Sequence, residues 1–136
     1  TVILFPKHRD FMKTEKLYMI TFTLLIAHQI DAAFWKEWEM FFLPGGIQFF
    51  DLFNLGIIPI LLLGLRSVIL LEKKGYMYSI LTSFLGIITF IIHLGFFLFG
   101  FEQFKLPLSV AIIVLCLLSA TVQLFFTIKQ KENFKA

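Results

Sequence analysis

The sequence predicts an all-α fold: a four-span transmembrane helix bundle in a single domain, residues 1–136, with both termini in the cytoplasm. The composition supports this, because 59% of the 136 residues are hydrophobic and 18% are aromatic, far more than in a soluble globular protein. Four apolar runs are each long enough to cross a hydrocarbon core of about 30 Å at about 1.5 Å per helical residue. The lysines and arginines gather at one side of these runs.

The first run, residues 15–36, follows a basic N-terminal segment, so it could be a signal peptide. A cleavable signal requires small residues before its cleavage site. This run instead continues into His28 and Asp31, which favours a retained first span. The next residues, KEWEMFFLPGGI, predict a turn, because Pro44 and the two following glycines stop a helix.

The other three spans are expected at residues 48–71, 76–101 and 107–128. Pro59 lies inside the second, where it removes a backbone donor and predicts a kink. The third contains one histidine, His93, and no formal charge. The fourth begins at Pro107, a residue that suits the first helical turn.

The charge distribution predicts the orientation. Ten of the twelve lysines and arginines lie in the N-terminus, the second connection with Arg66, and the C-terminal tail; Lys36 and Lys105 lie on the other side. Positive residues favour the cytoplasmic face, which predicts a multi-pass protein of the cell membrane with the lipid bilayer as its partner. The basic clusters alternate with apolar runs, which argues against nucleic-acid binding. Cys116 is the only cysteine, which excludes an intrachain disulfide and a cysteine-based metal cluster.

Small and polar residues recur in every span at steps of three, four or seven, which places them on one face of each helix. Such faces turn inward in a membrane bundle. They contain Thr14, Tyr18, Thr21, His28, Asp31 and Trp35 in the first span; Gln48, Asp51 and Asn54 in the second; Ser79, Ser83, Gly86, Thr89 and His93 in the third; and Ser109, Cys116, Ser119, Gln123 and Thr127 in the fourth.

Several of these residues lie at a similar depth, roughly 6 to 12 Å below the outer boundary at about 1.5 Å per residue. We therefore expect an outer-leaflet pocket, with Glu39 and the LPGG turn as its lid. Its expected lining is His28, Asp31, Gln48, Asp51, Asn54 and His93.

An ionised group inside a bilayer is costly unless it is paired or hydrated, which makes these carboxylates functional candidates. Asp31 lies three residues after His28, so its carboxylate could orient the imidazole. The alternative is a purely structural network, in which Asp31 pairs with His28 and Asp51 pairs with Asn54 or His93.

Three functions fit these residues. The first is a binding or accessory protein whose pocket takes a small ligand, a proton or a metal ion. The second is a metal-dependent membrane enzyme of hydrolase type. Its zinc or iron would be held by His28, Asp31 and His93, with Asp51 or Glu39 as the general base. The third is an oligomeric transporter of small solutes, built as a homo-oligomer. The sequence contains no HExxH motif, no Gly-rich phosphate loop and no nucleophile elbow.

The block LYMITFTLLIAHQIDAAFWKEWEMFFLPGGIQFFDLFNLGIIPILLLG, residues 17–64, resembles a family of small, uncharacterised four-helix bacterial membrane proteins. The resemblance implies four spans and an important region between His28 and Asp51, and it implies no activity. HQID with its Trp- and Glu-rich sequel is also similar to a His-x-x-Glu-Glu motif of other membrane proteins, although Ala32 follows Asp31 here.

Overall fold

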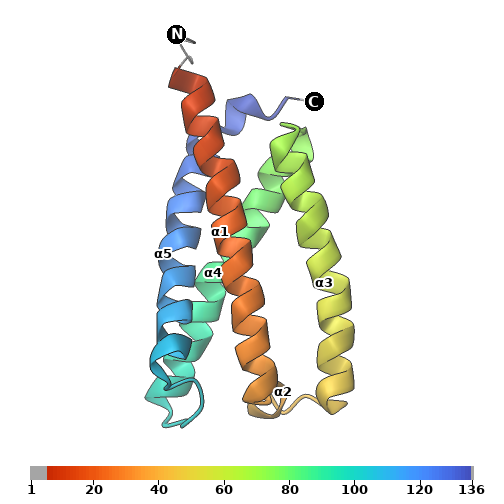
Figure 1. Ribbon diagram of the computed structural model, residues 1–136, viewed down its shortest axis with the longest axis vertical. Coiled ribbons are helices and arrows are strands. Elements are labelled where there is room, and N and C mark those ends of the chain that lie inside the picture. Colours follow the sequence, from red (N-terminus) through yellow and green to blue (C-terminus); the bar gives the residue numbers. More distant parts are fainter. Residues whose placement is uncertain (1–5, 136) are drawn as a thin grey trace.

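The computed structural model describes residues 6–135 (Figure 1), and all of its regular structure in this range is helical. The long helices are α1 (Pro6–Phe34), α3 (Gly46–Ile69), α4 (Lys73–Leu98) and α5 (Pro107–Lys129). Two short elements are α2 (Glu37–Met40) and the 3₁₀ helix η1 (Lys131–Asn133). Four helical segments are long and apolar enough to cross a membrane: residues 13–34 of α1, and the whole of α3, α4 and α5. The expectation of an all-α fold with four long apolar helices is confirmed.

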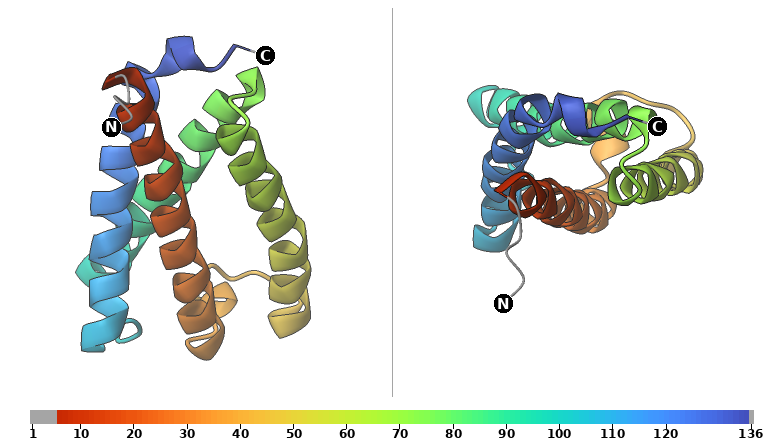
Figure 2. Two further views of the ribbon diagram at one scale, coloured as in Figure 1. Left: turned by 45° about the horizontal axis from the view of Figure 1, so that its top comes forward. Right: turned by 90° about the horizontal axis from the view of Figure 1, so that it is seen from above.

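The four long helices run up and down, so that both ends of the chain lie at the same end of the bundle (Figure 1). Helix α5 packs along α1 and α4, and α4 also packs along α3. Seen from above, α4 lies along one side of the bundle, with α1 and α3 along the other (Figure 2). Helix α4 diverges from α3 towards the end of the bundle that contains α2, where it lies beside α5 (Figure 1).

Small residues allow α1, α4 and α5 to approach closely. A Cβ atom on Gly86 of α4 would lie 2.6 Å from the Cβ atom of Ala120 on α5. Hydrogen bonds add to this contact, because Ser79 Oγ lies 2.7 Å from Thr127 Oγ1 and Gln123 Nε2 donates to Ser79 Oγ at 3.1 Å. Packing and interhelical hydrogen bonds are the forces that associate helices in lipid. The polar faces of these three helices therefore form the interior.

The polar face of α3, in contrast, is not buried in the interior. Gln48 and Asp51 are exposed and Asn54 is half-buried, with its Nδ2 bonded to the Phe50 carbonyl of its own helix at 2.9 Å. Pro59 lies inside α3 and does not end it. The first half of α3 thus contributes little to the interior.

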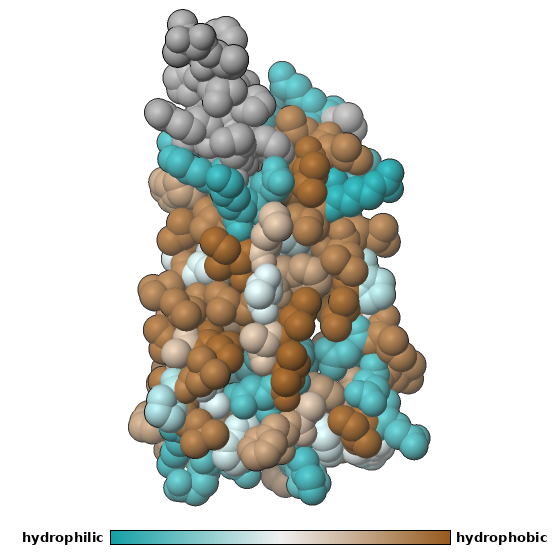
Figure 3. Space-filling model, in the orientation of Figure 1, coloured by the Kyte–Doolittle hydropathy of each residue, from teal (hydrophilic) through white to brown (hydrophobic). Residues whose placement is uncertain are grey.

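Hydrophobic residues form a broad band around the middle of the face in Figure 3, and hydrophilic residues gather towards both ends of the molecule. Many large apolar side chains of the long helices are exposed; Leu55, Phe84 and Phe97 are 73%, 57% and 62% exposed. An apolar surface of this extent fits a multi-pass membrane protein whose helices contact lipid.

Candidate metal centre

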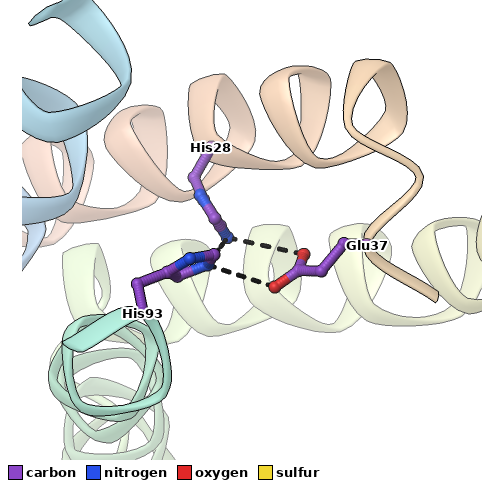
Figure 4. Close-up of side chains that lie close together, drawn as sticks. All are labelled: His28, Glu37 and His93. Atoms are coloured by element: carbon purple, nitrogen blue, oxygen red, sulfur yellow. Dashed lines mark hydrogen bonds and ion pairs between the residues drawn. The ribbon is translucent and has the colours of Figure 1, made fainter. Parts of the chain in front are cut away.

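A reversal of the chain after α1 creates the site. Helix α1 ends at Phe34, and Lys36 adopts a left-handed backbone conformation with φ 53° and ψ 52°. This conformation is uncommon for a residue with a side chain, and it turns the chain back under the bundle. Helix α2 then starts with Glu37, whose side chain is directed back towards α1 and α4 (Figure 4).

Three side chains from three helices meet there: His28 of α1, Glu37 of α2 and His93 of α4 (Figure 4). The Nε2 atoms of the two histidines are 3.2 Å apart. Glu37 Oε1 lies 3.1 Å from His93 Nε2, and Glu37 Oε2 lies 3.7 Å from His28 Nε2. All three residues are buried, with exposures of 3%, 8% and 6% for His28, Glu37 and His93.

Aromatic side chains close the site. Phe104, in the connection between α4 and α5, places its ring centroid 4.2 Å from that of His93 and 5.6 Å from that of His28. Trp38 of α2 is buried beside the site and packs on Phe50 of α3. These rings limit the access of water, which strengthens electrostatic interactions within the site.

The charge of Glu37 has no lysine or arginine partner among the described residues, and its ion pairs are those with the two imidazoles. A buried carboxylate is costly unless a positive charge compensates it. A proton on one imidazole would make the group neutral. A divalent cation would compensate the carboxylate and leave one positive charge, which a metal-bound hydroxide could balance.

The donor atoms have the spacing of a metal centre. Ligands at about 2.0–2.1 Å from a tetrahedral ion lie about 3.3 Å from one another. The Nε2–Nε2 distance of 3.2 Å and the 3.1 Å from His93 Nε2 to Glu37 Oε1 are close to this value, and the other Glu37 oxygen, Oε2, lies 3.7 Å from His28 Nε2. Two histidines and one carboxylate are the ligands of many catalytic zinc sites and of non-haem iron(II) sites, in which a coordination position stays open for water or substrate.

The outer nitrogens of the two imidazoles depart from the usual pattern. Nδ1 of His28 and Nδ1 of His93 are buried and have no hydrogen-bond partner in the described part of the chain. A metal-bound histidine normally donates its other N–H to a carboxylate, a carbonyl or water. Protein groups do not orient these two rings in that way.

Of the residues that the sequence pattern grouped together, the structure brings only His28 and His93 into contact. Asp31 is half-buried on α1, and its Oδ2 is buried without a hydrogen-bond partner among residues 6–135. Asp51 is exposed and shares with Asn54 a separate surface groove along α3, of about 440 Å³. Gln48 and Glu39 are exposed as well.

Gln48 and Asp51 lie outside the site because of the way α3 and its neighbours are arranged. Helix α4 diverges from the first half of α3 towards α5 (Figure 1), so α4 does not cover this half of α3, and α2 packs against both α1 and α3 at this end. The carboxylate in the site therefore comes from α2 as Glu37. The periodicity of the sequence gave no signal for Glu37. It lies nine residues after His28, which is about two and a half helical turns, so a continuous helix would place the two residues on opposite faces.

A family model described as a family of unknown function (DUF6713) matches residues 14–130. The matched range includes all three residues of the site and the four long apolar segments. No curated protein and no solved structure matches the chain.

Proposed function

The chain belongs to this family of unknown function, and we propose that it is a single-domain, multi-pass membrane protein that binds one divalent transition-metal ion, zinc or iron. The ligands are His28, Glu37 and His93. The observation that carries the proposal is the convergence, in a buried site, of two imidazole Nε2 atoms 3.2 Å apart with a carboxylate whose two oxygens lie 3.1 Å and 3.7 Å from them, and which has no lysine or arginine partner among the described residues.

The membrane placement is supported by the four long apolar helices and by the asymmetry of the basic residues. Under the positive-inside rule, both termini lie in the cytoplasm of the cell. The metal centre lies in the half of the bundle opposite to the termini (Figure 1), and therefore in the outer leaflet.

Three protein ligands leave one coordination position for water or a ligand, as in catalytic zinc sites. A bound divalent ion would supply Lewis acidity and a hydroxide near neutral pH, which supports a metal-dependent membrane enzyme of hydrolase type. The surroundings of the ion would be of low polarity, because Phe104 and Trp38 are both buried beside the three ligands.

Metal analysis of the protein purified in detergent tests the proposal. The wild type, exposed to zinc or iron(II) at neutral pH and then dialysed, should retain about one ion per chain. Glu37→Gln and His93→Ala should each lose most of it. Glu39→Gln is the matched control, because this carboxylate lies two residues away on the same short helix and is exposed. A wild type that retains no metal, or equal retention by the two glutamine variants, would overturn the proposal.

A second candidate function is the binding of a proton. The distance between His28 Nε2 and His93 Nε2, 3.2 Å, is that of a hydrogen bond, and the adjacent carboxylate would stabilise a shared positive charge. Protein with ¹⁵N-labelled histidine, free of metal, should then show one coupled titration of both imidazoles that Glu37→Gln abolishes; independent titrations would exclude it.

A further inference from the structure

We propose that the metal centre is the polar end of an apolar chamber that takes an amphiphilic molecule from the bilayer: one apolar chain with a metal-coordinating head group that carries at most one charge. The inference deepens the proposed function and rests on it. It assigns a ligand class to a cavity that borders the site.

The chamber has a volume of about 340 Å³ and lies between α1, α3 and α4, with α2 and the connection after it as its floor. Sites for small molecules have volumes of about 300–1,000 Å³, so the space suits one short chain or part of a longer one. Its apolar wall includes Phe41, Phe49, Phe50, Phe53, Leu85 and Ile92.

The polar groups of the chamber gather near the metal centre. His28, Glu37 and His93 all line it, and Gln29 lies beside His28. The Oε1 atom of Gln29 is buried and has no hydrogen-bond partner among the described residues. An unpartnered acceptor on a residue that lines the chamber would bind a head group that coordinates the metal and also donates an N–H or O–H.

Thr89 also lines the chamber, but its hydroxyl donates to the Leu85 carbonyl one turn earlier at 2.8 Å. This hydrogen bond is internal to α4, so the side chain can be replaced without breaking a contact between helices.

The opening of the chamber is apolar. Four apolar residues that line the chamber also reach the surface: Phe41, Leu43, Phe49 and Phe53 are 40%, 44%, 43% and 49% exposed. In a bundle surrounded by lipid, such residues favour entry of an acyl or alkyl chain over entry of a hydrated solute. Among the described residues, no lysine or arginine lines the chamber, so none of them compensates a multiply charged head group such as a phosphate monoester.

The test uses the cobalt(II)-substituted protein in nanodiscs of zwitterionic lipid, with two probes of equal metal-binding chemistry, octanohydroxamate and acetohydroxamate. Each probe changes the visible spectrum of the cobalt when it binds. Burial of a methylene group corresponds to roughly a fourfold gain in affinity. Because the bilayer competes for the longer chain, we expect octanohydroxamate to bind at least tenfold more tightly than acetohydroxamate.

Thr89→Phe fills the chamber and should remove this preference while the cobalt stays bound. Thr121→Phe is the matched control, because Thr121 is exposed on α5 and its hydroxyl donates to the carbonyl four residues earlier at 2.7 Å, as that of Thr89 does. Equal affinities of the two probes for the wild type, or a chain-length preference that survives in Thr89→Phe, would overturn the chamber and leave the metal centre intact.

A measurement that needs no metal separates the two proposals. Trp38 lines the chamber and Trp35 does not, so Trp35→Phe leaves one reporter tryptophan. In that background, 8-bromooctanoate should quench the fluorescence of Trp38 much more strongly than bromoacetate, and Thr89→Phe should abolish the difference. Absence of a cobalt spectrum with this quenching intact would reject the metal centre alone; absence of the quenching difference would reject the chamber.

Discussion

The Nε2 atoms of His28 and His93 face each other at 3.2 Å across the interface of α1 and α4, although 65 residues separate them in the chain. Their rings meet nearly edge to face, at an interplanar angle of 79°. Both imidazoles also approach the carboxylate of Glu37. This cluster is a buried polar link between α1, α2 and α4.

The two histidines should therefore be coupled energetically. Replacing either by alanine leaves the other buried without its partner, which should lower the free energy of unfolding of the metal-free protein by about 1–3 kcal/mol. The double variant should lose less than the sum, with a coupling energy of about 0.5–3 kcal/mol. Unfolding in mixed detergent micelles measures all four proteins. Additive losses would argue against a direct interaction. The pair His28→Ala with Thr121→Ala serves as the additive control, because Thr121 is exposed on α5 and outside the cluster.

Added zinc should stabilise the fold in a manner that depends on pH. At a free concentration of about one hundred times Kd, a ligand that binds only the folded state stabilises it by about 2.7 kcal/mol. Both imidazoles must be deprotonated to coordinate the ion, so protons compete with it. The rise in Tm should be full near pH 7.5 and should decrease as the pH is lowered, because protons then displace the ion from the imidazoles. Glu37→Gln should show little rise at either pH; an undiminished rise in this variant would place the zinc elsewhere.

The sequence predicts the inward faces of α1, α4 and α5 well. Tyr18, His28, Gly86, His93 and Gln123 all lie on these faces and are buried. A helix repeats its face every 3.6 residues, so the position of a residue around its own axis is local information. The small residues on these faces also decide which surfaces can approach closely, and this too is visible in the sequence.

The same reasoning fails for Asp51 and Glu37 for two different reasons. A helix has an inward face only where a neighbouring helix covers it, and α4 leans away from α3 at the end where Asp51 lies, which leaves Asp51 exposed (Figure 1). Glu37 reaches the site because Lys36 is left-handed. Glycine or asparagine usually marks such a position, and lysine does not. The two histidines could thus be predicted from the sequence, whereas their carboxylate partner depended on the path of the chain.

Gly86 should tolerate no side chain. A Cβ atom there would lie 2.6 Å from the Cβ atom of Ala120 and 3.2 Å from the Cys116 carbonyl oxygen, so α4 and α5 would have to separate. We expect Gly86→Ala to destabilise the protein by about 1–3 kcal/mol. Gly95→Ala is the control on the same helix, because nothing lies within 4 Å of its added Cβ atom. It should be neutral or slightly stabilising, since alanine favours a helix by up to about 1 kcal/mol over glycine. Equal unfolding free energies for the two variants would show that the close approach does not occur.

Both termini should lie in the cytoplasm. Ten basic residues lie on the side of the termini and two on the other side, and the structure places both chain ends at the same end of the bundle (Figure 1). Fusions to the C-terminus should give active green fluorescent protein and inactive alkaline phosphatase, and a cysteine at the exposed position 39 should react with an impermeant maleimide added outside intact cells. The opposite pattern would reverse the orientation and place the metal centre in the inner leaflet.

The left-handed turn at Lys36 should control the affinity for metal, because it aims Glu37 at the two histidines. Lys36→Gly keeps this conformation and removes the steric penalty of the side chain, which is roughly 1–2 kcal/mol, so we expect equal or higher stability and an unchanged affinity. Lys36→Val disfavours the conformation strongly, because valine is β-branched. It should lower the affinity for zinc at least tenfold in a competition titration with a chromophoric chelator. Both variants remove the same charge, so any difference between their affinities for zinc reflects the backbone conformation at residue 36. Equal affinities would show that the position of Glu37 does not depend on this turn.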